Sequence, residues 1–327
     1  MRNSLRQFSG FVGEMNELAR QHDAQSLANW AVQKLSETVG FDCAWYGWAQ
    51  LRDDGVDIHA QCSHNLTGAY YQSWCEIAEE DLLAAAIRKN PLRTAVYDRR
   101  GRSQTDGMIS LADCYGLNKM ATAMHARAGR SASFYLSSYR GGPQSRCWST
   151  EELDYLKCAV DQLSSAMHLS IAEAENDANS HTHSILVSDD GIVILGLQKL
   201  LEKIGYLWPE WKEDRLPDPL RNLIHIPGEH ILVDRQLIVD CGPASGINNM
   251  KLHRFTVRPL TRFDLLTQRE REVAGLLADG NSHKEAARIL GVAPATVRNQ
   301  TQSIYSKMGV TSRAELALQV RLRGSSL

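Results

Sequence analysis

A helix-starting pattern, Ser or Thr followed three residues later by Glu, occurs three times near the end of this 327-residue chain. The pairs are Thr267 with Glu270, Ser282 with Glu285, and Ser312 with Glu315. In such a pair the hydroxyl accepts a hydrogen bond from the third helical N–H, while the glutamate accepts one from the N–H of the capping residue. Pro294, between the last two pairs, suits a first helical position because no N–H is needed there. These signals predict four short helices.

The helix expected from Pro294 onward has two different faces. Its apolar stripe has spacings of four, three and four residues, at Val297, Thr301, Ile304 and Met308. The opposite face presents Arg298, Asn299, Gln302, Tyr305 and Ser306. Arginine can form two hydrogen bonds with guanine, and asparagine or glutamine can form two with adenine. The pattern therefore favours a helix-turn-helix that binds DNA, and the alternative is an ordinary solvated helix face.

The segment from Leu266 to Leu318 resembles the LuxR-type (GerE-like) helix-turn-helix family. The matching residues include Leu266, Thr267, Arg269, Glu270, Glu272, Val273, Leu276, Gly280, Lys284, Glu285, Ala287, Leu290, Val292, Thr296, Val297, Arg298, Ile304, Lys307, Met308, Val310, Arg313, Glu315 and Leu316. Because the resemblance covers the entire segment, we prefer DNA binding to a solvated helix face. It implies base-reading roles for Arg298, Asn299 and Gln302, and phosphate contacts for Lys284, Thr296 and Lys307. Ala293 stands where the family usually has serine, so a side-chain N-cap worth about 1 kcal/mol is missing.

Length and charge are consistent with such a module at the end of a larger chain. Two or three domains fit the length. Residues 265–327 contain nine Lys and Arg against five Asp and Glu, whereas the rest contains 27 against 33. A basic end on an acidic body fits a DNA-contacting module with a regulatory partner. The seven scattered cysteines are expected to be reduced and half-buried. No signal peptide and no run of 18 apolar residues is present, so a cytoplasmic protein without a membrane partner is expected.

Residues 1–173 are predicted to form an α/β sensor domain. Helices are expected over 23–39, 67–89 and 149–171, and strands over 43–49 (half-buried), 57–63, 120–127 and 132–139. The last helix begins at the capping pair Ser149 and Glu152. Its stripe of Leu153, Leu156, Val160, Leu163, Met167 and Ile171 is long enough to pack within the domain and against a second copy. The element order and the ending from Arg140 through Trp148 to Leu156 resemble a GAF domain.

Residues 174–260 are predicted to be a linker and a smaller α/β domain. Two strands within 185–195 flank an Asp-Gly turn, and a helix over 197–204 and strands over 230–240 and 251–259 follow. This arrangement resembles a small PAS domain. His181 and His183 are interpreted as solvated linker residues rather than metal ligands. No metal is therefore expected. Asp189 and Asp190 are interpreted as turn residues rather than phosphoacceptors.

Aromatic residues in the first domain suggest a ligand pocket. Tyr46 and Trp48 project from one face of the first strand, and Tyr70, Tyr71 and Trp74 cluster on the following helix. Pockets are mostly apolar with a few polar anchors. The predicted lining is therefore Tyr46, Trp48, His59, Tyr71, Trp74, Asp81 and Tyr115. The alternative is that these rings fill the core, and the two interpretations are nearly balanced because buried Tyr and Trp need polar partners.

Two other functions are less favoured. The stretch around Tyr70–Trp74 faintly resembles the autoinducer-binding domain. However, Ala78 replaces an expected tyrosine and Ile87–Arg88 an expected Asp-Pro, which disfavours an acyl-homoserine lactone ligand. No Gly-rich phosphate loop, G-x-S-x-G elbow or H-E-x-x-H motif occurs. An enzyme is therefore not expected, and no cofactor is expected.

The predicted fold class is α+β multidomain: GAF-like and PAS-like α/β domains followed by an all-α four-helix LuxR-type domain at 261–327. The predicted function is a one-component transcription regulator whose sensor domains bind a small molecule. The expected partners are a promoter or operator duplex, an effector and a second copy, with RNA polymerase as a further candidate. The final helix, with Leu316, Leu318 and Val320, would pair with the same helix of the second copy across a dyad. The alternatives are a constitutive DNA binder whose first half only dimerises or docks partners, and a sensor half with catalytic activity.

Overall fold

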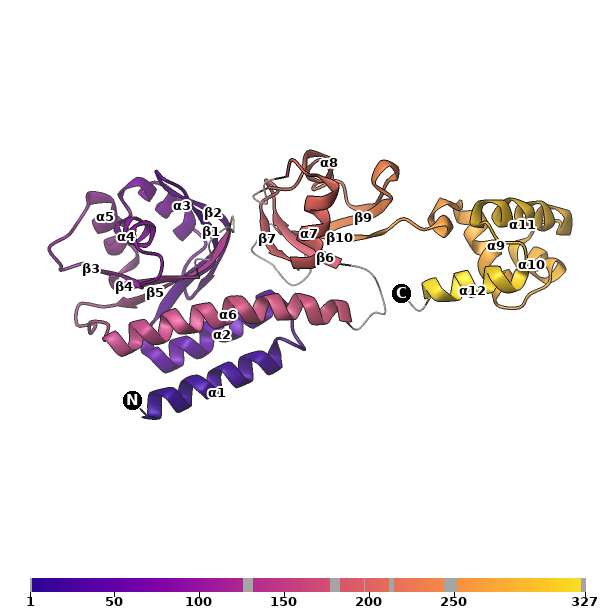
Figure 1. Ribbon diagram of the computed structural model, residues 1–327. Helices are drawn as coiled ribbons and strands as arrows, with labels where there is room; N and C mark the ends of the chain where they lie inside the picture. The colour runs from indigo at the N-terminus through magenta and orange to yellow at the C-terminus, as the bar shows by residue number, and fades with distance from the viewer. Residues whose placement is uncertain are drawn as a thin grey trace. The chain divides into compact units, whose positions relative to one another are not determined.

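A computed structural model describes most of the chain as two α/β domains followed by a helical domain (Figure 1). The described residues are 2–125, 132–176, 183–196, 198–211, 215–243 and 252–324. The α+β multidomain fold class predicted from the sequence is confirmed. Among the described helices, none combines the length and apolar character that crossing a bilayer requires.

The first domain is built on a five-stranded antiparallel sheet with the order β2-β1-β5-β4-β3. Its strands are β1 (Cys43–Leu51), β2 (Val56–His64), β3 (Ala95–Asp98), β4 (Leu117–Met124) and β5 (Ser133–Gly141). The predicted hairpin of β1 and β2 is confirmed. Strand β3 was not predicted, because four residues are too few to give a clear strand pattern. The expectation of a half-buried β1 is wrong, because this strand is buried along both faces.

Helices cover both faces of this sheet, which explains why β1 is buried on both sides (Figure 1). One face packs against α2 (Ala24–Leu35) and α6 (Thr150–Asn176), and α1 (Arg2–Leu18) packs on these two helices. The other packs against α3 (Tyr70–Cys75), α4 (Leu82–Lys89) and α5 (Asp106–Tyr115). The helix predicted over 23–39 is confirmed, but Ser36–Gly40 form a π-helical turn at its end. Helices α1 and α5 were not predicted.

Helix α6 has its predicted capping box and its predicted stripe. Ser149 N–H donates to Glu152 Oε2 at 2.9 Å, and Glu152 N–H donates to Ser149 Oγ at 3.2 Å. Leu156, Val160, Leu163 and Met167 are at most 1% exposed and belong to the domain's own core. This part of the stripe is therefore filled from within the chain.

The second domain has a five-stranded sheet in the order β7-β6-β10-β9-β8. Its elements are β6 (His183–Ser188), β7 (Val193–Gly196), α7 (Gln198–Leu207), α8 (Asp218–Arg221), β8 (Gly228–Leu232), β9 (Leu237–Pro243) and β10 (Leu252–Pro259). The Asp-Gly hairpin is confirmed. The single strand predicted over 230–240 is wrong: a 3₁₀ turn at Val233–Arg235 and a left-handed Gln236 separate β8 from β9. Counted along the chain, both sheets follow the same order, with the first and last strands adjacent at the centre.

Candidate functional site

The C-terminal domain consists of four helices around one small core. They are α9 (Gln268–Ala278), α10 (His283–Leu290), α11 (Pro294–Met308) and α12 (Arg313–Gly324). The stripe predicted on α11 is confirmed, since Val297, Thr301, Ile304 and Met308 are all buried. Gly309 ends α11 with a left-handed φ of 65°, a conformation that other residues rarely adopt.

Capping boxes begin the helices much as the sequence predicts. Both hydrogen bonds of the box are present at Thr267–Glu270 and at Ser282–Glu285. The third pair differs, because the Glu315 carboxylate accepts from the Thr311 N–H at 2.8 Å instead of from Ser312. Ala293 makes no side-chain cap at the start of α11, as expected.

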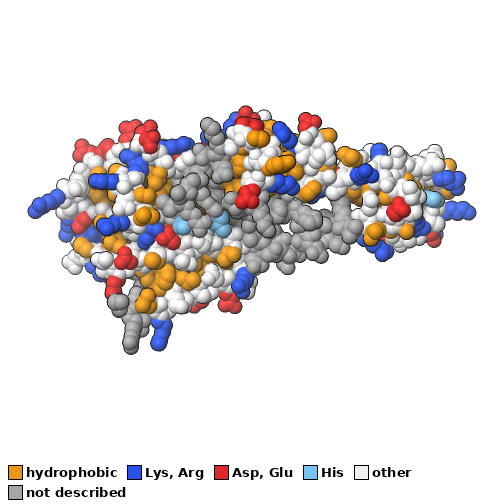
Figure 2. All heavy atoms as spheres, viewed as in Figure 1, with side chains coloured by type: hydrophobic (Ala, Val, Ile, Leu, Met, Phe, Trp, Pro, Cys, Tyr) orange, Lys and Arg blue, Asp and Glu red, His pale blue; other side chains and the backbone are white. Residues whose placement is uncertain are grey.

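The outer face of α11 is polar and exposed. Arg298, Asn299 and Gln302 lie on it, and none makes a side-chain hydrogen bond or ion pair to any part of the chain that the structure describes. Lys284 on α10 and Thr296 on the first turn of α11 are exposed as well. In the view of Figure 2, basic side chains stand out from the surface of this domain. The arrangement offers several hydrogen-bond donors and positive charges to one external partner.

Comparison with known proteins places this geometry in a family. Residues 264–320 match the model of the luxR family of bacterial regulatory proteins. They are a LuxR-type helix-turn-helix domain. The chain is 46% identical over 56 residues to the transcriptional regulatory protein UhpA of Escherichia coli, which is 17% of this chain and 29% of that protein. It is 42% identical over 53 residues to MctR of Rhizobium johnstonii, which is 16% of this chain and 25% of that protein.

Longer relatives match over a similarly short stretch. An HTH-type transcriptional regulator of Mycobacterium tuberculosis (strain H37Rv) is 38% identical over 68 residues, which is 21% of this chain and 8% of that protein. The chain thus spans less than a third of the length of these curated relatives.

Two solved structures overlap with about half of the chain at low TM-scores. One is the N-acylhomoserine lactone dependent LuxR family factor CepR2 of Burkholderia cenocepacia, with a TM-score of 0.37 and 14% identity, covering 50% of this chain and 94% of that one. Another is a phycoerythrobilin-bound GAF domain from a cyanobacterial phytochrome, with a TM-score of 0.37 and 13% identity, covering 51% and 98%.

Lys307, for which a phosphate contact was predicted, has a partner inside the LuxR-type domain. Its Nζ lies 2.8 and 2.7 Å from the two carboxylate oxygens of Glu270, which also accept from Ser303 Oγ and the Thr267 N–H. Burial raises the pKa of Glu270, but these hydrogen bonds outweigh it and lower the pKa to about 2. The start of α9 is thereby bonded to the last turns of α11. The capping motif predicts Glu270, but the sequence spacing does not predict its bond to Lys307, because the two residues are 37 positions apart.

Leu316 and Val320 on α12 pack against the core of the same domain, and Leu316 is 0% exposed. Only Leu318, at 60%, is strongly exposed among the three residues expected to pair across a dyad. Asp264, a buried carboxylate just before α9, was not predicted as a functional residue. Arg258 donates to its two oxygens at 2.8 and 3.0 Å, which links the end of β10 to the entrance of the LuxR-type domain.

In the first domain the structure does not bring the seven predicted pocket residues together. Tyr46 and Trp48 face α2 and α6, whereas Tyr71, Trp74, Asp81 and Tyr115 lie on or near the helices of the opposite face. His59 lies where the register between β1 and β2 shifts, and its Nδ1 is 3.8 Å from Asp190 Oδ1. Burial lowers the pKa of His59.

Trp45 on β1, which was not among the predicted pocket residues, packs against the aromatic side chains of α3. Its ring centroid lies 5.1 Å from that of Trp74 and 5.3 Å from that of Tyr135. Side chains alternate between the faces of a strand, so Trp45 must point away from Tyr46 and Trp48. That alternation was the available signal for separating the two groups.

Four of the predicted residues have partners for their polar tips within the protein, whereas the buried His59 Nε2 has none among the described residues. Tyr46 donates to Asn29 Oδ1 at 2.6 Å, Trp74 Nε1 donates to Asp81 Oδ2 at 2.8 Å, and the Tyr115 and Ser73 hydroxyls are 2.9 Å apart. Asp81 also caps α4. Burial raises the pKa of Asp81, partly offset by these hydrogen bonds. Packing alone therefore accounts for these contacts.

Tyr135, which packs against Trp45 in the same region, gives a test of whether this region is packed core. It is 4% exposed, and its hydroxyl has no hydrogen-bond partner within the described residues. An unsatisfied buried hydroxyl costs about 1–3 kcal/mol, so Tyr135→Phe should raise the free energy of unfolding by about 1 kcal/mol. The matched control is Tyr139→Phe on the same strand, which removes the acceptor of the Tyr70 hydroxyl at 2.9 Å. It should lower the free energy by about 1 kcal/mol. Urea denaturation that finds both variants destabilised would contradict this.

An open cavity of about 490 Å³ lies elsewhere on the first domain, and none of the seven predicted residues lines it. Its lining is Leu82, Val96, Tyr97, Asp98, Gly101, Arg102, Ser103, Lys119, Cys147, Trp148 and Leu153. Lys119 and Asp98 form an ion pair at 2.5 Å, and that hydrogen bond raises the pKa of Lys119 and lowers the pKa of Asp98. The indole N–H of Trp148 is buried and has no hydrogen-bond partner in the described part of the chain.

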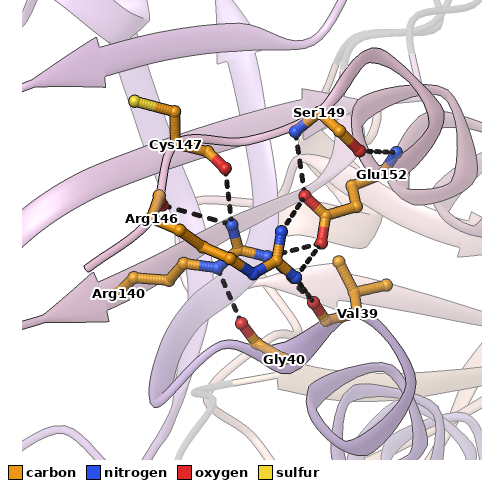
Figure 3. A network of polar contacts seen from close by, with 7 residues as sticks. All are labelled: Val39, Gly40, Arg140, Arg146, Cys147, Ser149 and Glu152. Atoms are coloured by element: carbon orange, nitrogen blue, oxygen red, sulfur yellow. Dashed lines mark hydrogen bonds and ion pairs between the residues drawn. The ribbon is translucent and has the colours of Figure 1, made fainter. Parts of the chain in front are cut away.

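A polar network joins this cavity to the first turn of α6. Arg140 lies with its guanidinium carbon 3.7 Å from the centre of the Trp148 ring. Figure 3 shows Arg140 and Arg146 converging on the Glu152 carboxylate while also reaching the carbonyls at the end of α2. Arg140 donates to the Val39, Gly40 and Cys147 carbonyls at 2.8, 2.7 and 3.2 Å, and to Glu152 at 2.8 Å.

Glu152 is held ionised by this network. Burial raises its pKa, but hydrogen bonds from Arg146, Arg140 and the Ser149 N–H outweigh that effect and lower the pKa to about 2. The ends of α2 and β5 and the start of α6 are therefore tied together through one buried guanidinium and one carboxylate.

Proposed function

We propose that this chain is a bacterial transcription regulator that places α11 in the major groove of double-stranded DNA. In that role Arg298, Asn299 and Gln302 contact base edges, while Lys284 and Thr296 contact phosphates. The observation that carries the proposal is that Arg298, Asn299 and Gln302 on the polar face of α11 are exposed and make no side-chain hydrogen bond or ion pair within the described residues, while the other face of the helix is fixed in the core. Base contacts then set sequence preference, and phosphate contacts set affinity and register.

Lys307 enters this proposal in a changed role. Its ion pair with Glu270 fixes the end of α11, and any phosphate contact it makes shares the ammonium group with that carboxylate. We therefore assign it a positioning role and keep the phosphate contact as a secondary one.

Binding measurements with duplexes selected from a random library test the docking of α11. Arg298→Ala should cost about 1–3 kcal/mol at the selected site and relax discrimination at one base pair. Lys284→Ala should weaken all duplexes alike and reduce the salt slope by about one unit. Arg93→Ala is the matched control, because it removes an exposed positive charge from the first domain. The reverse pattern for the first two variants would show that the docking register is wrong.

We further propose that residues 1–173, as a GAF-like domain, bind a small-molecule effector in the 490 Å³ cavity. Apolar side chains such as Val96 and Leu153 would enclose its body, and the buried indole N–H of Trp148 would donate to an acceptor on it once the ring turns toward the cavity. Because Trp148 lies under Arg140, and Arg140 bonds the first turn of α6, occupation of the cavity would act on α6. Residues 174–260, as a PAS-like domain, would then pass the change to the LuxR-type domain at 261–327.

A thermal-shift screen of metabolites against the full chain tests this sensing role. A compound that stabilises the chain should lose at least about tenfold in affinity in Trp148→Phe, which keeps an aromatic ring, although a smaller one, but removes the donor. A blank screen together with strong DNA binding would favour the alternative of a constitutive binder. Turnover of a compound would instead favour a catalytic sensor half.

A homodimer in the cytoplasm, where bacterial DNA lies, completes the proposal. Two recognition helices reach successive half-sites when they stand about 34–36 Å apart. Exposed Leu318 on α12 and Leu169 on α6, at 60% and 48%, are available for contact with a second copy. Light scattering that detects only monomers, with and without DNA, would refute this part.

A further inference from the structure

Three side chains with metal-binding atoms meet in the second domain, although their positions in the sequence are far apart. Asp189 lies in the turn between β6 and β7, His225 follows α8, and His253 lies on β10. One ligand atom from each lies within 4.8 Å of the other two. His253 Nε2 is 2.6 Å from Asp189 Oδ1, and the two imidazole rings meet edge to face with centroids 5.4 Å apart.

Bonds independent of the three side chains hold their backbone in place. Ser188, beside Asp189, is 1% exposed and its hydroxyl accepts from the Ile192 N–H at 3.0 Å, which fixes the hairpin turn. Gly191 in that turn has a φ of +86°, and a Cβ there would lie 3.2 Å from Ile224 Cδ1. This close approach brings the turn beside the residue that precedes His225. Cys241 on β9 donates its thiol to the Ile224 carbonyl at 3.4 Å.

We propose that Asp189, His225 and His253 bind a first-row divalent cation, and Zn²⁺ in particular. Two imidazoles and one carboxylate are a ligand set that zinc accepts, with a fourth position open to water or to another ligand. The same set of two histidines and one carboxylate also suits non-haem Fe²⁺. The proposal therefore follows from the type of ligand atoms and not from the fold of the domain. The cation would satisfy all three groups at once, whereas the His253–Asp189 hydrogen bond involves only two of them.

Only small side-chain movements are needed to complete the site. Tetrahedral zinc with bonds of about 2.0–2.1 Å separates its ligand atoms by about 3.3 Å. The 2.6 Å contact between His253 and Asp189 would open slightly, and His225 would close on them. His225 is exposed and the Asp189 side chain is 43% exposed, so both can turn and a cation can enter from solvent.

Such a cation would fasten together three segments of the second domain: the β6–β7 turn, the segment after α8, and β10. Strand β10 is the last strand before the LuxR-type domain in the chain. Binding of the cation would therefore stabilise the strand from which the chain continues into that domain. This inference does not depend on what the cavity of the first domain binds.

Equilibrium dialysis of the full chain against Zn²⁺, with the bound metal counted by mass spectrometry, tests the site. We expect one Zn²⁺ per chain that is lost in His225→Ala, and at least about a tenfold weaker site in Asp189→Asn. Asp189→Asn keeps the size and shape of a partly exposed side chain, so folding is preserved. Co²⁺ in place of Zn²⁺ should give a visible d–d spectrum without a thiolate charge-transfer band.

The control is a double variant, His181→Ala with His183→Ala, which removes two histidines that lie shortly before Asp189 in the sequence. It should bind Zn²⁺ like the wild type. The proposal is overturned if the wild type binds no Zn²⁺, if the double variant loses the site, or if His225→Ala and Asp189→Asn retain it at full affinity. A thiolate band in the Co²⁺ spectrum would overturn it as well, because cysteines would then be the ligands.

Discussion

Arg140→Ala is expected to lower the free energy of unfolding of the first domain by about 3–5 kcal/mol, the usual cost of removing one partner of a buried ion pair. Arg140 is 3% exposed. Its loss leaves the Val39, Gly40 and Cys147 carbonyls without this donor and Trp148 without its cation. Chemical denaturation of the full chain measures the loss, and hydrogen exchange in β5 and α6 assigns it to this domain.

Arg146→Ala is the matched control for Arg140→Ala. Arg146 bonds the same Glu152 carboxylate, but its side chain is 63% exposed. Exposed ion pairs contribute about 0–1 kcal/mol, so this variant should cost less than about 1 kcal/mol. Equal losses in the two variants would show that burial of Arg140 is not what makes the network strong.

The same network predicts acid sensitivity. In the folded chain burial raises the pKa of Glu152, but the hydrogen bonds from Arg146, Arg140 and the Ser149 N–H lower it to about 2, from the ordinary value of 4.5 for a glutamate. A carboxyl group with a depressed pKa contributes stability above its unfolded pKa and loses that stability as the pH falls toward the folded pKa. The wild type should therefore lose stability between about pH 4.5 and pH 2. Glu152→Gln should lose less over that range, and an unchanged pH profile would contradict the assignment.

Glu270→Gln is expected to lower the free energy of unfolding of the LuxR-type domain by about 1.5–3 kcal/mol, the range for hydrogen bonds to charged groups. The change removes the ion pair with Lys307 and one acceptor from a side chain that is 9% exposed. The end of α11 then loses its bond to α9. A double-mutant cycle with Lys307→Met should give a coupling energy of about 1–2 kcal/mol.

Glu272→Gln provides the control on the same helix. Its carboxylate pairs with Arg269, and both side chains are more than a third exposed, at 40% and 37%. The substitution should change stability by less than about 0.5 kcal/mol. Strictly additive losses for Glu270→Gln and Lys307→Met would mean that the two residues act independently, and the positioning role of Lys307 would have to be abandoned.

Local signals made the LuxR-type domain predictable. The capping pair Thr267–Glu270 and the stripe on α11 involve residues three or four positions apart, so sequence spacing alone determines which side chains meet. What these residues touch on other helices, such as Lys307 with Glu270, depends on how the helices pack. Contacts between different helices therefore cannot be predicted from the spacing of residues in the sequence.

The first domain was predicted less well, for a similar reason. Most strands were found, but the assignment of aromatic residues to one pocket failed because strand alternation divides them between two faces of the sheet. Which face meets the helix with Trp74 is decided by the topology. The Asp189–His225–His253 cluster is harder still, because three separate segments supply one ligand each and no two lie at a motif spacing.

The π-helical turn at Ser36–Gly40 has a consequence for how this chain can vary. Such a turn corresponds to a single amino acid added to a regular helix, and its Val39 and Gly40 carbonyls both accept from Arg140. In a homologue that has lost one of these five residues, the two carbonyls would point elsewhere. The buried Arg140 guanidinium would then lack these acceptors. Arginine at position 140 and the added amino acid should accordingly be gained and lost together during evolution.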